Sequence, residues 1–539
     1  MKRKISALTS VILAAVLLAG CSSNSESALN EWVDGGANYD AMESSYDNTV
    51  GMDGGSYVGG ANTDETASLD SEANTEEYNS IKENSYVSVA AAPLSTFSID
   101  VDTASYSDLR RRITEGRDIY PESIRIEEMI NYFNYDYPEP AEGEPFSVTT
   151  ELTDCPWNED TQLMMIGLQA EEIDMSERAP MNLVFLIDVS GSMYDENKLP
   201  LVQKSFALLT ENLTAQDRIS IVTYAGDDKV VLEGADGNDQ TAVLEAINAL
   251  EAGGSTAGAA GITTAYEIAE KYFISGGNNR IILATDGDLN VGVSSEAELT
   301  RLVEEKRESG VFLSVLGFGS GNYKDNKMEA LADNGNGNYS YIDSLMEARR
   351  VLVEEMGGTL VTIAKDVKIQ VEFNPAYIKG YRLVGYENRA LAAEDFDDDT
   401  KDAGEIGAGH SVTALYEVIP VDSPMELSSD DLKYEGNEAA GVENGELLTV
   451  AIRYKEPDSD ESKLLEYPAS ESVYSALMSD NLAFASAVAE FGMVLRESEY
   501  KGSATCESVL TLIGKCDITN DPYKTEFKEL VEIMQRNGY

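Results

Sequence analysis

Apolar positions along this chain follow two different periods, and the change of period marks how the chain is organised. Between about residues 181 and 357, short apolar runs alternate with segments in which apolar residues recur at helical spacing. Runs such as Met181–Ile187 and Arg280–Thr285 are typical of strands buried on both faces of a parallel sheet. Strands that alternate with helices in this way predict a doubly wound, mostly parallel α/β sheet.

The pattern assigns an element to each part of this domain. The predicted strands are Met181–Ile187, Arg218–Tyr224, Lys229–Leu232, Arg280–Thr285, Val311–Phe318 and Asn338–Ile342. The predicted helices are Leu199–Leu213, Thr241–Leu250, Gly258–Ile274, Ser294–Ser309, Asp325–Ala332 and Ser344–Met356.

Strand-like segments take over on both sides of this domain. They are Thr96–Asp102, Phe146–Asp154 and Gln162–Ala170 before it, and Val367–Phe373, Tyr381–Tyr386, Val412–Ile419 and Leu447–Tyr454 after it. Their presence on both sides predicts one β-sandwich assembled from both flanks, into which the α/β domain is inserted. Helical spacing marks four other segments: Ser105–Thr114, Pro121–Phe133, Ser470–Arg496 and Ser503–Asn537.

The N-terminus has the pattern of a targeting segment. Basic residues at positions 2–4 precede an apolar run, 11–18, that ends in Leu18-Ala19-Gly20-Cys21. This arrangement resembles a bacterial lipoprotein signal with its lipobox, which implies cleavage before Cys21 and attachment of lipid (palmitate) to that cysteine. An uncleaved N-terminal membrane anchor is the alternative, but the apolar run is short for a spanning helix.

Composition and charge exclude several partners. Residues 21–94 are rich in Asn, Ser, Gly, Asp and Glu, with Lys82 as their only basic residue, and such a segment predicts an acidic, disordered tether. The net charge of −58 makes nucleic-acid binding improbable, because no basic stripe is present to neutralise phosphates. Attraction to anionic lipid is disfavoured for the same reason. A lipid anchor would therefore hold the protein at the membrane.

Residues for nucleophilic catalysis are scarce. His410 is the only histidine of the chain and lies in a Gly-rich turn before a predicted strand, where a structural or exposed role is expected. Catalysis by Ser-His-Asp or Cys-His arrangements is therefore disfavoured. Beyond Cys21, the chain has Cys155, Cys506 and Cys516, an odd number that excludes a complete disulfide framework. Cys506 and Cys516 could pair or remain free thiols.

The stretch Asp188-Val189-Ser190-Gly191-Ser192 directly follows the buried strand Met181–Ile187. It would lie at the carboxyl end of that strand, where open α/β sheets bind their ligands. One carboxylate and two hydroxyls form a poor nucleophile set but suit a hard divalent cation. Thr256, in a Gly-rich loop that opens a helix, and Asp286, which follows a second buried strand, offer further oxygens.

These five residues, Asp188, Ser190, Ser192, Thr256 and Asp286, resemble the metal-ion-dependent adhesion site (MIDAS) of von Willebrand factor A domains. The resemblance implies a bound Mg²⁺, or else Mn²⁺ or Ca²⁺. The hydroxyls would coordinate it, while the two carboxylates would act directly or through water. The ion would accept an Asp or Glu carboxylate of a protein partner, and the last helix, Ser344–Met356, would shift between open and closed states. A degenerate site or ordinary capping hydroxyls are the alternative.

The whole layout resembles a family of bacterial von Willebrand factor A lipoproteins with an N-terminal extension and a C-terminal domain of unassigned function. The resemblance rests on Ser98–Tyr106, Arg125–Phe133, Gly385–Arg389, Phe484-Ala485 and Glu490–Met493. Within the first of these, Asp100-Val101-Asp102-Thr103-Ala104-Ser105 echoes the metal motif, but its oxygens stand in another order. A strand end followed by helix capping is the interpretation we favour there.

We compare three classes of function: a metal-dependent hydrolase, an adhesin and an assembly factor of the cell envelope. A metal-dependent hydrolase of the haloacid-dehalogenase kind needs a second Asp where Ser190 stands, so we expect no enzyme and no small-molecule substrate. Metal-dependent adhesion and assembly of the cell envelope require the same site chemistry and differ only in the partner. In both, the protein would be lipid-anchored and exposed outside the cytoplasm.

The predicted organisation has six parts. They are a lipoprotein signal peptide (1–20), an acidic disordered tether (21–94), an N-terminal extension that leads into the β-sandwich (95–180), the von Willebrand factor A-like domain (181–357), a β-rich domain (358–465) and a helical C-terminal region (466–539).

Overall fold

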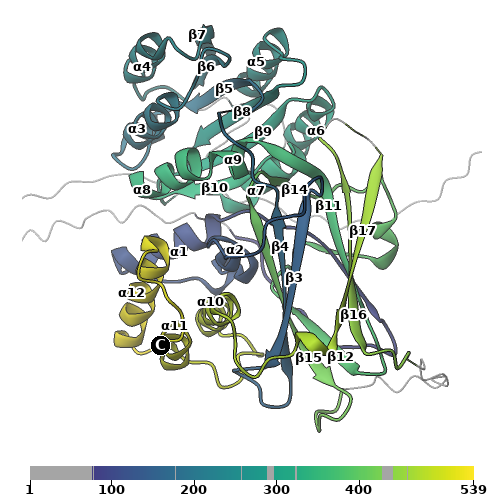
Figure 1. The fold of residues 1–539 in the computed structure, drawn as a ribbon. Coiled ribbons are helices and arrows are strands. Elements are labelled where there is room, and N and C mark those ends of the chain that lie inside the picture. Colours follow the sequence, from purple (N-terminus) through teal and green to yellow (C-terminus); the bar gives the residue numbers. More distant parts are fainter. Residues whose placement is uncertain are drawn as a thin grey trace, which may run out of the picture. The chain divides into compact units, whose positions relative to one another are not determined.

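A computed structural model describes residues 76, 78–176, 178–255, 258–287, 296–321, 324–427, 441–457, 459 and 461–539. The described residues form three β-sheets, with helices around them (Figure 1). The predicted signal peptide, the lipidation residue Cys21 and most of the predicted tether lie outside the described residues.

The α/β domain contains a six-stranded sheet in the order β10-β9-β8-β5-β6-β7. Its neighbouring strands are parallel except for the antiparallel pair β6 and β7. The strands are β5 (Met181–Asp188), β6 (Arg218–Tyr224), β7 (Asp228–Asp236), β8 (Asn278–Thr285), β9 (Phe312–Phe318) and β10 (Tyr339–Ile342). The prediction of a doubly wound, mostly parallel sheet is confirmed.

Helices pack on both faces of this sheet. They are α3 (Leu199–Thr210), α4 (Gln240–Asn248), α5 (Gly258–Lys271), α6 (Glu296–Arg307) and α7 (Asp325–Asn334). Alternate residues of β5 enter two different apolar cores: Phe185 packs in the core that includes α3 and α4, and Leu186 in the core that includes α5 and α7. A strand that supplies both cores must be apolar at nearly every position, which explains its continuous apolar run.

The other two sheets form a β-sandwich built from both flanks of the α/β domain, as predicted. Their strand orders are β1-β12-β15-β4-β3 and β13-β2-β11-β16-β17, with β14 paired to β11. Met164 and Tyr416 from the first sheet share one apolar core with Val371 and Ile452 from the second. The strands are β1 (Val87–Ser88), β2 (Leu94–Ser98), β3 (Phe146–Asp154), β4 (Gln162–Ala170), β11 (Thr362–Phe373), β12 (Ile378–Val384), β13 (Ala390–Leu391), β14 (Gly404–Gly407), β15 (Ser411–Pro420), β16 (Glu446–Lys455) and β17 (Ser462–Ser470).

Helices from the two ends of the described chain share a single core. Phe133, which follows α2, makes an edge contact with Phe484 of α10 at 4.9 Å and with Phe527 of α12 at 5.4 Å between ring centroids. The helices are α1 (Ala104–Glu115), α2 (Ile126–Asn131), α10 (Asp480–Arg496), α11 (Cys506–Ile513) and α12 (Pro522–Arg536). The N-terminal extension and the C-terminal helices therefore form one packed unit.

Four predicted helical segments are interrupted. The segment Ser470–Arg496 begins with a 3-10 turn, η5 (Glu471–Val473), and becomes an α-helix only at Asp480, while Ser503–Asn537 is divided into α11 and α12. The segment Pro121–Phe133 forms a 3-10 turn, η1 (Pro121–Ser123), and then α2, because Ile124 and Arg125 are extended. The extended Arg125 donates its backbone N–H to Ser105 Oγ, and its guanidinium reaches Glu329 at 2.8 Å. The segment Ser344–Met356 is divided into α8 (Leu345–Arg349), a π-helical segment η3 (Arg350–Glu354) and α9 (Met356–Leu360).

Other boundaries and contacts differ from the predictions. Ordered packing begins before residue 95, because Tyr86 donates to the Glu417 carboxylate at 2.5 Å and β1 and β2 precede that position. The predicted boundary after residue 465 falls inside β17. The helix-capping interpretation of residues 100–105 was wrong: Thr103 makes no side-chain cap, and the carboxylates of Asp100 and Asp102 pair with Arg389 at 3.1 and 2.9 Å.

Three further features concern the described residues only. Cys155, Cys506 and Cys516 are all free thiols. His410 is buried rather than exposed. Within the part of the chain that the structure describes, none of the helices combines the length and the apolar character needed to cross a membrane.

Candidate metal centre

The candidate site lies at the carboxyl end of β5, where the strand order of the sheet reverses. β5 is hydrogen-bonded to β6 on one side and to β8 on the other, and all three strands run parallel. From β5 the chain continues to β6 and β7, then crosses to β8 on the opposite side. Such a switch point leaves a crevice at the carboxyl ends of the strands, which is where open α/β sheets bind ligands.

Asp188, Ser190 and Ser192 are held close together at this edge. Asp188 Oδ1 accepts the backbone N–H of Ser190 at 2.8 Å, and the hydroxyls of Ser190 and Ser192 lie 2.9 Å apart. Asp188 and Ser190 are fully buried, whereas Ser192 is half-buried. Two hydroxyls and a carboxylate therefore converge at this edge, and Ser192 is the most exposed of the three side chains.

A glycine loop lies directly against this motif. Gly191 donates its N–H to the carbonyl of Gly254 at 3.1 Å, and Gly253 donates to the carbonyl of Val189 at 2.8 Å. Gly254 has a φ of +89°, a left-handed conformation that favours glycine. Thr256, the predicted ligand two residues further on, lies outside the described residues. Its role as a ligand stays a prediction.

Asp286 follows β8 and is fully buried. Lys198, the residue before α3, places its Nζ 2.9 Å from Asp286 Oδ2, and its side chain lies against Gly319. Sequence reasoning missed Lys198. The lysine itself gives no local sign of a buried carboxylate partner, because Asp286 lies at the end of a different strand.

Burial raises the pKa of the Asp188 carboxyl to about 6; hydrogen bonds from Ser190 oppose this shift, and the charge of Asp286 adds to it. Thr285 supports the same carboxylate, since its hydroxyl donates to Asp188 Oδ2 at 3.3 Å. A buried carboxylate with a raised pKa is stabilised when a cation is placed beside it. The site is therefore prepared electrostatically for a positive charge.

The donor set fits a hard divalent ion. The described oxygens come from the hydroxyls of Ser190 and Ser192 and the carboxylates of Asp188 and Asp286, and oxygen donors of these kinds are what Mg²⁺ prefers. No cluster of three or more His, Cys, Asp or Glu side chains arranged for a metal occurs among the described residues. A bound ion here would depend on hydroxyls and water, which leaves it electrophilic toward an additional carboxylate ligand.

Lys198 is expected to set the charge of this site. Asp188, Asp286 and Lys198 together carry one negative charge, so the site with a divalent ion bound would have a net charge of +1. Without the lysine, the ion-bound site would be neutral. In Lys198→Met we expect metal binding to tighten, by roughly tenfold, because a neighbouring ammonium group repels the ion. Isothermal titration calorimetry with Mg²⁺ and Mn²⁺ measures the change.

Lys204→Met is the matched control, because Lys204 is an exposed lysine of the same helix. Its metal affinity should equal that of the wild type. Equal affinity of the Lys198→Met variant and the wild type would contradict a direct electrostatic effect of Lys198 on the ion.

Three family models match consecutive parts of the chain. The model described as von Willebrand factor matches residues 72–165, the von Willebrand factor type A domain matches 182–354, and the C-terminal region of uncharacterized protein YfbK matches 358–536. The second match includes Asp188, Ser190, Ser192, Thr256 and Asp286.

Two curated proteins are similar over much of their length. The uncharacterized protein YfbK of Escherichia coli (strain K12) is 42% identical over 470 residues, which cover 85% of this chain and 81% of that protein. The uncharacterized protein sll0103 of Synechocystis sp. (strain ATCC 27184 / PCC 6803 / Kazusa) is 27% identical over 312 residues, 57% of this chain and 69% of that protein. Among solved structures, von Willebrand factor type A from Catenulispora acidiphila is 16% identical, with a TM-score of 0.40 over 71% of this chain and 88% of that chain.

Proposed function

Because this chain belongs to the bacterial family of von Willebrand factor type A domain proteins that share the YfbK C-terminal region, we propose that it is a metal-dependent protein-binding module of the cell envelope. Its divalent ion, Mg²⁺ or alternatively Mn²⁺ or Ca²⁺, is held by Asp188, Ser190, Ser192, Thr256 and Asp286. The ion accepts an Asp or Glu carboxylate from a protein partner, and the site carries out no catalysis.

The observation that carries this proposal is the arrangement at the end of β5. A buried carboxylate, two converging hydroxyls and a second carboxylate compensated by Lys198 give a site with few direct negative ligands. Such a site leaves positive charge on the ion, and a partner carboxylate is the natural ligand for it. A hydrolase of the haloacid-dehalogenase kind would need a second Asp at the position of Ser190, and a serine hydroxyl is a poor general acid or base.

Anchoring and location are part of the same proposal. Cleavage before Cys21 and lipidation of its thiol would hold the folded part outside the cytoplasm at the membrane, at the end of the acidic segment that follows Cys21. Mass spectrometry of the membrane fraction tests this directly, with a lipid-modified N-terminal Cys21 as the expected result and an unmodified N-terminus as the contrary one.

Assembly of the envelope with a fixed site is favoured over a switching adhesin by one set of contacts. Glu347 of α8 is fully buried and binds three groups: Arg110 of α1 at 2.7 Å, Tyr132 at 2.8 Å and Arg350 at 2.8 Å. Arg110 also reaches Glu526 of α12 at 3.1 Å. We call Arg110, Tyr132, Asp343, Glu347, Arg350 and Glu526 the Arg110 cluster.

The Arg110 cluster restrains the element that would have to move in a switching A domain. Arg110 forms a bidentate pair with Asp343 at 2.6 and 2.8 Å, and the guanidinium carbon of Arg350 lies 3.9 Å from the centre of the Tyr132 ring. A displacement of α8 and η3 would break buried charge-assisted hydrogen bonds, which are costly to leave unmade. This favours a partner that binds a site of constant shape.

A pull-down from the cell's own membrane fraction tests the function. Tagged full-length protein is incubated with solubilised envelope in Mg²⁺ or in EDTA, beside the Ser192→Ala variant. We expect a stoichiometric partner that is recovered only with Mg²⁺ and only by the wild type. Recovery that is equal in EDTA would contradict a metal-bridged contact. Failure to recover an envelope partner, together with Mg²⁺-dependent binding to other cells or surfaces, would favour adhesion.

A further inference from the structure

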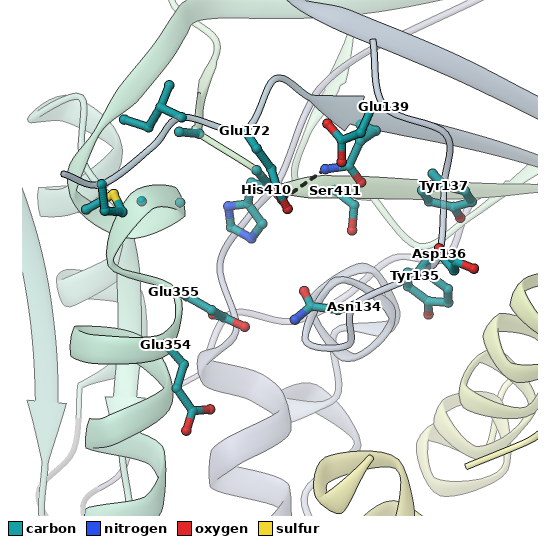
Figure 2. A pocket seen from close by; sticks show the side chains of 17 residues that line it. Asn134, Tyr135, Asp136, Tyr137, Glu139, Glu172, Glu354, Glu355, His410 and Ser411 are labelled. Carbon is teal, nitrogen blue, oxygen red and sulfur yellow. Dashed lines mark hydrogen bonds between the residues drawn. The ribbon is translucent and has the colours of Figure 1, made fainter. Parts of the chain in front are cut away.

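A cavity separate from the candidate metal centre lies where the α/β domain joins the sandwich. It has a volume of about 440 Å³, within the range of small-molecule sites, and is shown in Figure 2. Four segments far apart in the sequence line it: residues 134–139 after α2, residues 169–175 at the end of β4 and beyond it, residues 354–358 around the start of α9, and residues 408–411 at the start of β15. Both connections between the α/β domain and the sandwich therefore contribute to its wall.

The charged side chains that line this cavity, among the described residues, are all acidic. Asp136, Glu139, Glu172 and Glu354 are exposed at its rim. Glu355 lies further in, with 16% of its side chain exposed, and accepts a hydrogen bond from Arg350 at 2.7 Å. Carboxylates gathered around a concave surface concentrate cations there.

His410 provides a second and independent indication of a ligand. Only 8% of this residue is exposed, and its Nδ1 is buried without a hydrogen-bond partner. In Figure 2 its ring lies between Glu172 on one side and Glu355 and Asn134 on the other. Burial, with a smaller contribution from the charge of Arg350, lowers the pKa of His410 to about 4, so the ring is neutral near pH 7. A neutral imidazole has one donor and one acceptor nitrogen, and leaving a buried one unpaired is costly.

We propose that this cavity binds a primary ammonium or guanidinium group, with Glu172 and Glu355 as its counter-charges and His410 as a hydrogen-bond partner. Tyr137 and Tyr135 line the same cavity, and the chain's own Lys524 already lies over the Tyr135 ring, 5.6 Å from its centre. A metal ion is a poorer occupant of this cavity, because the described Glu and His side chains that line it are not grouped closely enough to ligate one together.

The occupant comes from another molecule. The chain carries no Lys or Arg between residues 5 and 81, so the acidic segment before the folded part has no cation to insert. The source is either a free amine or a basic side chain of a protein. This site is distinct from the candidate metal centre and does not depend on a bound divalent ion.

Isothermal titration of the full chain at saturating Mg²⁺ tests the proposal. The probes are agmatine and cadaverine as free amines, and blocked Gly-Arg-Gly and Gly-Lys-Gly as side-chain mimics. We expect saturable binding at one site, weakened roughly tenfold in Glu172→Gln because one counter-charge is lost. His410→Gln should weaken binding to a similar degree. Tight binding of the free amines would identify a small amine as the source, and binding of the tripeptides alone would identify a protein.

Glu466→Gln is the control, because Glu466 is an exposed carboxylate of β17 that does not line the cavity. Its affinity should match that of the wild type. Absence of saturable binding would overturn the proposal. So would an equal loss in Glu172→Gln and Glu466→Gln, because that result would indicate diffuse attraction to an acidic protein. Glu172 is exposed, so its variant remains informative even if His410→Gln does not fold.

Discussion

Replacement of Glu347 by glutamine is expected to lower the free energy of unfolding by about 3 kcal/mol. Glu347 is fully buried in the Arg110 cluster and accepts hydrogen bonds from Arg110, Tyr132 and Arg350. Burial by itself would raise the pKa of Glu347, but the two guanidinium groups lower it to about 2. The glutamine keeps the shape of the side chain but is neutral, so Arg110 and Arg350 each lose one negatively charged partner. Urea unfolding followed by circular dichroism measures the loss.

The ion pairs of Glu347 with Arg110 and Arg350 also predict that the stability of the protein depends on pH. A carboxyl whose pKa is about 2 when folded and near 4.5 when unfolded stabilises the folded protein fully above pH 4.5. That contribution is lost as the pH falls toward 2, so the wild type and Glu347→Gln should become equally stable at the acidic end. Glu354→Gln is the control, because its pair with Arg349 is exposed and should contribute less than about 1 kcal/mol. Similar losses in both variants would contradict a special role for the Arg110 cluster.

Replacement of Asp188 by asparagine is expected to weaken Mg²⁺ and Mn²⁺ binding roughly 100-fold or more. The substitution removes the only carboxylate of the Asp-x-Ser-x-Ser motif and keeps the acceptor oxygen for the Ser190 N–H. Because burial makes the ionised form of Asp188 unfavourable without a cation, the metal-free variant should be no less stable than the wild type. Isothermal titration calorimetry measures the affinity, and urea unfolding measures the stability.

Asp195→Asn is the matched control for the metal measurement. Asp195 is exposed and lies close to the motif in sequence, so its removal changes the nearby charge without touching the site. Its metal affinity should stay within about twofold of the wild type. Unchanged affinity in Asp188→Asn would remove the candidate metal centre from this position.

The α/β domain and the central strands of the sandwich could be predicted because those strands contain their own signal, whereas β1, β13, β14 and β17 were not predicted. β5 is apolar at successive positions since both of its faces are buried, and β15 pairs with β4 over residues 411–418 inside the sandwich. Periodicity detects such elements directly. The interruptions within Pro121–Phe133 and Ser344–Met356 had no local signal, because they serve side chains that reach distant partners. Arg125, for example, extends to Glu329.

The burial of charged side chains in the interior could not be predicted either, because their partners are distant in the sequence. Arg110, Arg111 and Arg112 occupy consecutive positions of α1 and are all buried, with exposures of 3%, 5% and 2%. Three consecutive arginines normally indicate a solvated helix face, and only partners far away in the sequence make their burial tolerable. Asp343, Glu347 and Glu526 are such partners for Arg110. Lys198 was missed for the same reason, since its partner Asp286 is on another strand end.

Insertion of the α/β domain into the sandwich imposes an order on folding. Gln169 of β4 pairs with Ser411 of β15, so β4 cannot form its central pairing until the whole α/β domain has been synthesised. Strands β3 and β4 can pair with each other before then but present an open edge. The α/β domain, whose sheet pairs only strands of its own, can fold meanwhile, and its closely placed ends then lower the entropic cost of joining the two flanks.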